Sequence, residues 1–180
     1  MKESSKAALG GMVSALAVVV MLCTYLSPLL VYTAPPFAGV LLLLIVNELG
    51  YKWSVGTFAA ISLLSVFIIA DKESAVFFTM FFGYFPILSV FIKEKLKNKV
   101  IGYFIKLIIF NISCFAAVLV SVFVFGIKYD DITGEGIFYT ISFIALMNLL
   151  FVVYNRLVDS LQILYISRLQ KRFRKLFNIK

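Results

Sequence analysis

The chain has 180 residues, of which 62% are hydrophobic and 14% are charged, and its formal net charge is +8. Soluble domains contain about 45–50% apolar and about 25% charged residues. This composition therefore excludes an ordinary water-soluble domain and indicates an integral membrane protein. The positive charge is better explained by orientation in the membrane and by contact with anionic lipid than by nucleic acid, which we do not expect as a partner.

The sequence lacks residues on which several classes of function depend. The chain contains no His, which removes the commonest proton shuttle and metal ligand. It carries no Gly-rich phosphate loop with Lys and no visible set of nucleophile, base and orienting residue. We therefore expect no catalytic residues, no metal site and no cofactor. Cys23 and Cys114 lie inside apolar runs and are interpreted as small buried side chains.

Six apolar runs follow one another, separated by short polar gaps. Each is close to the length of about 20 residues that crosses the hydrocarbon core. Strands of a membrane barrel have about ten residues, so helices are the only structure that pairs the backbone of such long runs in lipid. The sequence predicts an all-α integral membrane domain over 1–158 with six transmembrane helices. The runs cover 7–26, 33–49, 53–70, 74–92, 100–127 and 137–158.

The positive charges are distributed unevenly about these spans. Of the 17 Lys and Arg, 15 fall on one side of the membrane, and only Lys72 and Lys128 fall on the other. Cytoplasmic flanks retain Lys and Arg, so we expect both termini in the cytoplasm. We expect the membrane to be a bacterial plasma membrane. Lys106 lies one to two turns inside the fifth span and is expected to reach the interface along its aliphatic stem.

The first span carries two strips of small residues. Residues four apart share a helix face, and small side chains there allow another helix to approach closely. A strip of this kind is suited either to packing within the bundle or to docking a separate membrane partner, and both interpretations stay open. The strips consist of Ala7, Gly11 and Ala15, and of Gly10, Ser14 and Ala17.

Prolines predict a loop after the first span. Segment 27–36 has no charged residue and contains Pro28, Pro35 and Pro36. Because Pro removes a helical hydrogen bond and restrains the residue before it, we expect the second span to begin near Pro36. An uncharged loop at membrane depth is buried or lines a cavity. It is therefore interpreted either as a lid over a substrate or as an interfacial loop anchored by Tyr32.

The fourth span is rich in aromatic residues and contains Pro86, which predicts a kink. Rings such as that of Tyr84 are suited either to stacking on a ring-shaped ligand or to facing lipid and filling the core.

The sixth span carries a polar face. Asn148 is predicted near mid-membrane, with Asn111 of the fifth span as its natural partner. An intramembrane polar group marks a functional site by default, and the alternative is an interhelical hydrogen bond worth about 0.6 kcal/mol. Arg156 and Asp159, three residues apart, are expected to pair. The polar face consists of Asn148, Asn155, Asp159 and Gln162, at spacings of seven, four and three.

Residues 159–180 predict a basic amphipathic helix. Such a helix is suited to the inner membrane surface, where apolar side chains enter the lipid and basic ones contact anionic headgroups. Docking on a cytoplasmic partner is the alternative. The basic side chains are Arg168, Lys171, Arg172, Arg174 and Lys175.

This layout resembles the substrate-binding S component of energy-coupling factor (ECF) transporters. The residues that carry the resemblance are 6–17, the Pro-rich segment after the first span, and 48–56. The resemblance implies capture of a small molecule from outside, with release driven by partner ATPase subunits through a membrane coupling protein. That family docks its coupling protein on an Ala-x-x-x-Ala face, which here corresponds to Ala7, Gly11 and Ala15, with Gly replacing one Ala.

The resemblance favours an organic, vitamin-like micronutrient, because the His-rich N-terminus of metal-transporting members is absent. The residues we expect to contact the substrate are Asn111, Asn148, Tyr32 and Tyr84. The alternative function is a scaffold or assembly factor in envelope or spore biogenesis. Transport predicts that Asn111, Asn148 and segment 32–36 border one outward cavity, whereas a scaffold predicts a solid bundle.

Overall fold

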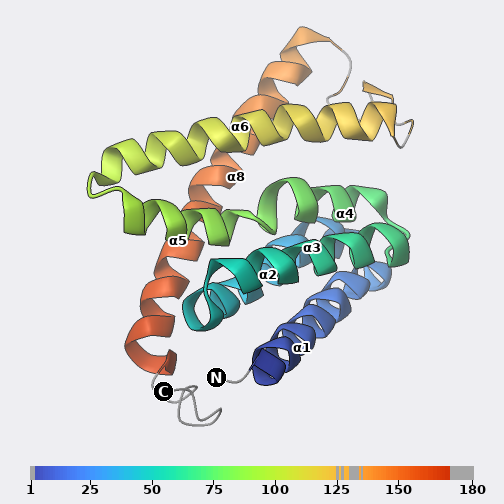
Figure 1. Ribbon diagram of the computed structural model, residues 1–180. Helices are drawn as coiled ribbons and strands as arrows, with labels where there is room; N and C mark the ends of the chain where they lie inside the picture. Colours follow the sequence, from blue (N-terminus) through green and yellow to red (C-terminus); the bar gives the residue numbers. More distant parts are fainter. Residues whose placement is uncertain (1–2, 125, 127, 130–133, 135, 171–180) are drawn as a thin grey trace.

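The computed structural model describes residues 3–124, 126, 128, 129, 134 and 136–170 (Figure 1). Within them, six helical stretches are long and apolar enough to cross a membrane, which confirms the predicted all-α fold and its number of spans. Which end faces the cytoplasm stays a prediction. The stretches are Glu3–Leu26, Leu29–Leu49, Tyr51–Ile68, Lys72–Lys95, Lys99–Phe123 and Ile137–Arg168.

The helices form two groups around a central, interrupted span. Helices α1 (Glu3–Leu22), α2 (Pro28–Leu49) and α3 (Tyr51–Ile68) pack together, and the short turn η1 (Cys23–Leu26) ends the first of them. The central span consists of α4 (Lys72–Phe77), the π-helical segment η2 (Phe78–Phe82) and α5 (Phe85–Lys95). Helix α6 (Lys99–Phe123) lies along its other side, and α8 (Ile137–Leu164) crosses behind α6 and contacts α2, α5 and α6 (Figure 1). Segment η3 (Tyr165–Leu169) continues α8.

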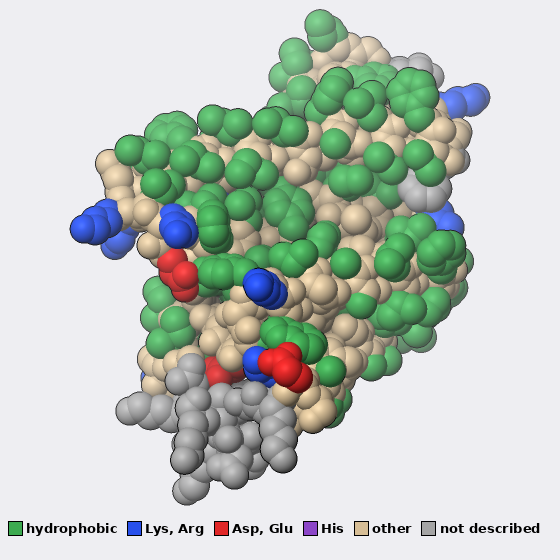
Figure 2. Space-filling view, in the orientation of Figure 1, with side chains coloured by type: hydrophobic (Ala, Val, Ile, Leu, Met, Phe, Trp, Pro, Cys, Tyr) green, Lys and Arg blue, Asp and Glu red, His purple; other side chains and the backbone are tan. Residues whose placement is uncertain are grey.

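Helices α6 and α8 expose long rows of apolar side chains. Figure 2 shows such side chains across much of the visible face. Such rows are compatible with contact to lipid tails, because a soluble monomer seldom exposes so large an apolar area. Examples are Ile108, Ile112 and Phe115 on α6, and Ile141, Leu149 and Val153 on α8.

The two ends of the bundle differ in charge. We call the end that holds the α1–α2 and α3–α4 connections the acidic end, because Asp71, Lys72 and Glu73 there have a formal charge of −1. We call the opposite end the basic end: it holds the start of α1 and the α2–α3 and α5–α6 connections, and Lys52, Lys93, Lys95, Lys97 and Lys99 lie in or beside these connections.

The prolines after the first span lie inside α2, so the loop predicted over 27–36 is wrong. Ser27 caps the helix, Pro28 begins it, and Pro35 and Pro36 continue it. The two internal prolines leave two carbonyls one turn earlier without helical donors. An extended segment would leave many more backbone groups unpaired in lipid, and the full burial of Pro35 shows that neighbouring helices surround this turn.

The central span is interrupted, as Pro86 predicted. Pro86 has no N–H to donate to the carbonyl of Phe82, four residues earlier. The hydroxyl of Tyr154 on α8 donates to this carbonyl at 3.0 Å and is buried with it. A backbone group freed by the proline is thus paired by a side chain from another helix, which joins α8 to the middle of the bundle.

Gly39 on α2 allows this contact to form. A Cβ at this position would overlap the Phe82 carbonyl oxygen and lie 2.7 Å from the Tyr154 hydroxyl. The rings of Phe82 and Tyr154 pack edge to face beside it, with centroids 4.8 Å apart. We call Gly39, Phe82 and Tyr154 the central junction, because α2, η2 and α8 meet there.

A small second core lies at the basic end. Helix α2 ends before Gly50, whose φ of 83° is suited to glycine, as the sequence predicted. Trp53, the only Trp in the chain, lies in the first turn of α3 and packs against the buried cluster of Leu9, Val13 and Ile45.

Adding one methyl group at the central junction should destabilise the fold. We expect Gly39→Ala to lower the free energy of unfolding by about 1–3 kcal/mol, because the new Cβ meets backbone that cannot yield. The melting temperature of the detergent-purified protein measures this. Gly56→Ala on α3 is the control, since its Cβ would meet open space. Equal melting temperatures for the two variants would show that α2 does not approach η2 closely.

Candidate ligand cavity and polar sites

A cavity of about 590 Å³, the main cavity, lies where α2, α4–η2, α6 and α8 meet. Sites for small organic ligands have volumes of about 300–1,000 Å³. Tyr32 and Glu73 place one end of the cavity at the acidic end of the bundle, and Tyr154 places the other at the central junction. The interruption of the central span therefore shapes the inner wall of the cavity.

Aromatic rings form much of the wall of the main cavity. Phe77 and Phe81 pack with centroids 5.7 Å apart, and Phe81 lies 5.4 Å from Phe110 on α6. Tyr32 meets Phe77 edge to face at 5.7 Å. These contacts hold the rings in place, so the cavity presents a largely apolar surface of fixed shape.

Polar groups are few in this wall. Among the described residues that line the main cavity, Glu73 is the only charged one. The Tyr32 hydroxyl donates to Glu73 Oε2 at 3.4 Å. The Tyr154 hydroxyl is engaged by the Phe82 carbonyl. The cavity is thus suited to a mainly apolar molecule with a polar group at the acidic end.

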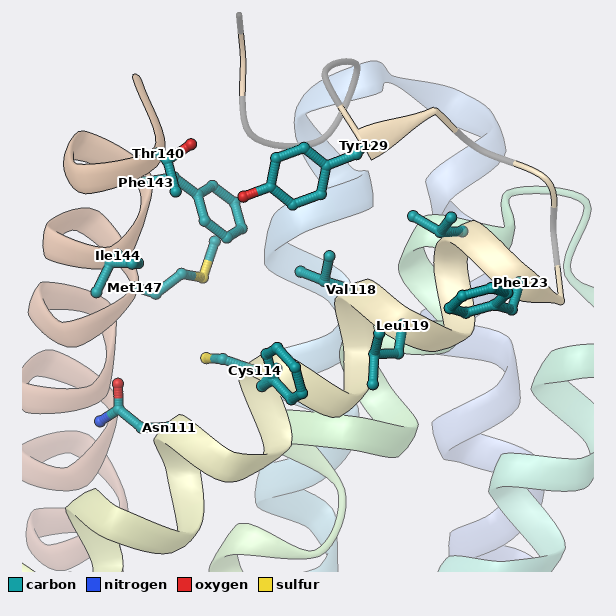
Figure 3. Close-up of a pocket in the computed structure, with 12 residues that line it drawn as sticks. Asn111, Cys114, Val118, Leu119, Phe123, Tyr129, Thr140, Phe143, Ile144 and Met147 are labelled. Atoms are coloured by element: carbon teal, nitrogen blue, oxygen red, sulfur yellow. The ribbon is translucent and has the colours of Figure 1, made fainter. Parts of the chain in front are cut away.

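A second space of about 410 Å³, the α6–α8 gap, adjoins the main cavity (Figure 3). Figure 3 shows Cys114 and Val118 on α6 facing Phe143 and Met147 on α8. These four residues line both spaces. The side chains between α6 and α8 therefore separate the main cavity from a space that reaches toward the acidic end of the bundle.

Asn111 and Asn148, predicted as substrate residues, bond to each other. Asn111 Nδ2 donates to Asn148 Oδ1 at 3.0 Å, and Asn148 Nδ2 donates to Asn111 Oδ1 at 3.2 Å. Each amide also donates to a carbonyl of its own helix at 2.9 Å, that of Leu107 or of Ile144. This is the interhelical bond that the sequence offered as the alternative, and it ties α6 to α8.

The four predicted substrate residues lie in three places. Tyr32 lines the main cavity and Asn111 lines the α6–α8 gap. Within the described part of the chain, Asn148 lines neither of these two spaces. Tyr84 is half-buried, with its hydroxyl 2.8 Å from Ser113 Oγ on α6. The predicted common border is therefore not formed, while contact of any of these residues with a substrate stays a prediction.

Lys106 is buried, which corrects the expectation that it reaches the interface. It is 5% exposed and points between α5 and α8. Its Nζ donates to Asn155 Oδ1 at 2.6 Å and to Ser89 Oγ at 3.3 Å, and lies 3.8 Å from Asp159 Oδ1. These oxygens offset the loss of hydration that burial of an ammonium group otherwise imposes.

Asp159 also pairs differently from the prediction. Its Oδ1 lies 2.8 Å from Lys93 Nζ on α5, whereas Arg156 was the expected partner. Lys93 also donates to Gln162 Oε1 at 2.8 Å. Asn155, Asp159 and Gln162 of the polar face therefore pair with the cations of α5 and α6. We call Ser89, Lys93, Lys106, Asn155, Asp159 and Gln162 the polar cluster.

The two small-residue strips of α1 have different surroundings. Gly10, Ser14 and Ala17 are buried, and a Cβ at Gly10 would lie 3.2 Å from Thr57 Oγ1 on α3. The strip of Ala7, Gly11 and Ala15 is exposed, and a Cβ at Gly11 would meet nothing within 4 Å. One strip thus serves packing within the bundle and the other is free for a partner.

The basic tail is described only in part. Helix α8 continues without interruption through the boundary predicted at 158–159, and η3 contains Arg168. Lys171, Arg172, Arg174 and Lys175 lie outside the described residues.

Sequence analysis missed Glu73 as a cavity residue. Glu73 was not among the residues predicted to contact the substrate. Its position in the first turn of an aromatic-rich span was the available signal, but only the approach of α2 and α8 shows that a cavity lies beside it.

Comparison of the chain with protein-family models, with curated proteins and with solved structures finds no match. The fold itself defines a helical protein with six membrane-length spans, and the main cavity is its candidate ligand site.

Removing the carboxylate of the polar cluster should destabilise the bundle. We expect Asp159→Ala to lower the free energy of unfolding by up to about 3 kcal/mol, because Lys93 and Lys106 are left without a counter-charge. Chemical unfolding in mixed micelles measures the change. Arg156→Ala, on the exposed surface of the same helix, is the control. If Asp159→Ala proves no less stable than this control, the cluster does not join α5, α6 and α8.

Proposed function

We propose that this protein is a membrane-embedded capture subunit that binds a small organic molecule in the main cavity. The observation that carries the proposal is a space of about 590 Å³ bordered by α2, α4, η2, α6 and α8. The space is open at its rim, where Tyr32, Leu146 and Val153 are more than half exposed. Sites for small organic ligands are clefts of this size that are lined mainly by apolar and aromatic side chains.

The charge distribution supports capture from outside the cell. If the basic end faces the cytoplasm, as the Lys and Arg asymmetry indicates, the main cavity lies toward the outer surface of a bacterial plasma membrane. Both chain ends would then be cytoplasmic. The captured molecule would be a vitamin-like micronutrient, as the resemblance to ECF S components implies.

Release inward would depend on other subunits. The sequence carries no nucleotide-binding loop, so partner ATPases and a membrane coupling protein would supply the energy. The exposed strip of Ala7, Gly11 and Ala15 supports such an association, because its small side chains allow close approach of a partner helix.

Filling the main cavity should abolish capture without unfolding the protein. Ala117 on α6 is buried and lines the cavity, so Ala117→Trp would place a large ring inside it. We expect the variant to retain at least tenfold less small molecule than the wild type, as measured by native mass spectrometry. Ala59→Trp on the exposed face of α3 is the control. Equal retention by both variants would contradict a ligand site in this cavity.

Enlarging the exposed strip should prevent docking. We expect Gly11→Leu to reduce co-purification of the coupling protein and ATPases at least tenfold while the retained small molecule is unchanged, because the added side chain keeps the partner helix away. Ser142→Leu on the exposed face of α8 is the matched control. Undiminished co-purification with Gly11→Leu would contradict docking on this strip.

A scaffold is the second candidate, and the Asn111–Asn148 pair favours it. Both amides bond to each other and to their own helices, so they serve to join α6 and α8. A scaffold would carry no small molecule, and Ala117→Trp would leave its associations intact. The cavity-filling variant therefore distinguishes the two functions.

A further inference from the structure

The main cavity carries its charge at one end only. Phe81 and Phe110 lie in its interior, and Glu73 lies at the acidic end. A ligand that fills this space would bury an apolar body among the rings and place its last atoms beside a carboxylate.

We propose that the main cavity binds an organic cation, a molecule with an apolar or aromatic body and an ammonium-type group held by Glu73. This inference rests on the proposed function, because it names the chemical class of the captured molecule. An ammonium group is attracted both by a carboxylate and by the face of an aromatic ring. Glu73 and Phe77 lie one helical turn apart on α4 and both line the cavity. Glu73 supplies the carboxylate and Phe77 supplies the aromatic ring.

Tyr32 holds this end of the cavity in shape. Its hydroxyl donates to Glu73 Oε2 at 3.4 Å, and its ring meets Phe77 edge to face with centroids 5.7 Å apart. The single hydrogen bond leaves Glu73 Oε1 free to accept from a ligand, since a carboxylate has about four acceptor positions. Tyr32 thus orients the carboxylate without neutralising it.

Lys72, the residue next to Glu73, does not form an ion pair with the Glu73 carboxylate. Lys72 Nζ donates to the carbonyls of Val66 at 2.8 Å and of Ile69 at 3.0 Å, and so caps the end of α3. Asp71 accepts from the backbone N–H groups at the start of α4. Across the described residues, no Lys or Arg forms an ion pair with Glu73. Its negative charge is therefore available to a ligand.

The charge of the residues around Glu73 also favours a cationic ligand. Asp71, Lys72 and Glu73 at the start of α4 have a formal charge of −1, whereas the chain as a whole has a formal charge of +8. A field of this sign raises the local concentration of cations and disfavours anions. The negative charge at this end of the cavity would repel carboxylate and phosphate ligands.

Three soluble probes of similar size test the proposal. Benzylammonium is a cation with N–H donors, benzyl alcohol is neutral and phenylacetate is an anion. Titration calorimetry with the detergent-purified full chain gives their affinities. We expect the cation to bind at least tenfold more tightly than the neutral probe, and the anion more weakly than either. Glu73→Gln should lower the affinity for the cation at least tenfold and leave that for benzyl alcohol within twofold.

Two further variants make the test specific. Glu73→Asp keeps the charge and should retain the preference for the cation, which excludes misfolding as the cause of any loss. Glu3→Gln removes one negative charge from the exposed start of α1, at the basic end, and should change none of the affinities.

Two results would overturn the inference in different ways. If benzyl alcohol binds and Ala117→Trp abolishes its binding, but the cation is not preferred, the ligand class is wrong and capture in the main cavity stands. If none of the probes binds the wild type, the inference fails, and a native mass spectrum without a bound small molecule would then remove the proposed function as well.

Discussion

The carbonyl of Phe82 is the group on which the arrangement of the bundle depends. Pro86 deprives it of its helical donor, and in lipid an unpaired backbone carbonyl is costly. The Tyr154 hydroxyl supplies the missing bond, and Gly39 leaves the space in which that bond forms. The requirement to pair one backbone oxygen thus brings α2, the central span and α8 together at the central junction. Phe82 and Tyr154 of this junction also line the main cavity.

The remaining polar interactions differ between the two ends of the bundle. Toward the basic end, buried Lys106 is surrounded by oxygens of α5 and α8, which makes that half a joined unit. Toward the acidic end, α6 and α8 are joined by the Asn111–Asn148 pair and then border open space lined by rings. A bundle closed at one end and hollow at the other is a suitable form for a subunit that takes its ligand from one side of a membrane.

The spans could be predicted from the sequence because hydropathy and helix length decide them locally. The helix stop at Gly50 and the interruption at Pro86 follow from backbone chemistry and were also predictable. The loop over 27–36 was predicted wrongly because burial of Pro35 depends on neighbouring helices that a local rule does not include. The positions of Lys106 and Glu73 were missed for the same reason, since their partners or neighbours come from helices distant in the chain.

Trp53 packs with Leu9 and Ile45 in the second core, at the end of the bundle opposite Glu73. As the only indole in the chain, it makes intrinsic fluorescence a reporter of how α1 and α3 associate. Occupation of a site near the other membrane face would leave this emission almost unchanged, whereas a partner helix that displaced α1 would alter it. The fluorescence of Trp53 should therefore respond to assembly with a partner and not to binding of a ligand.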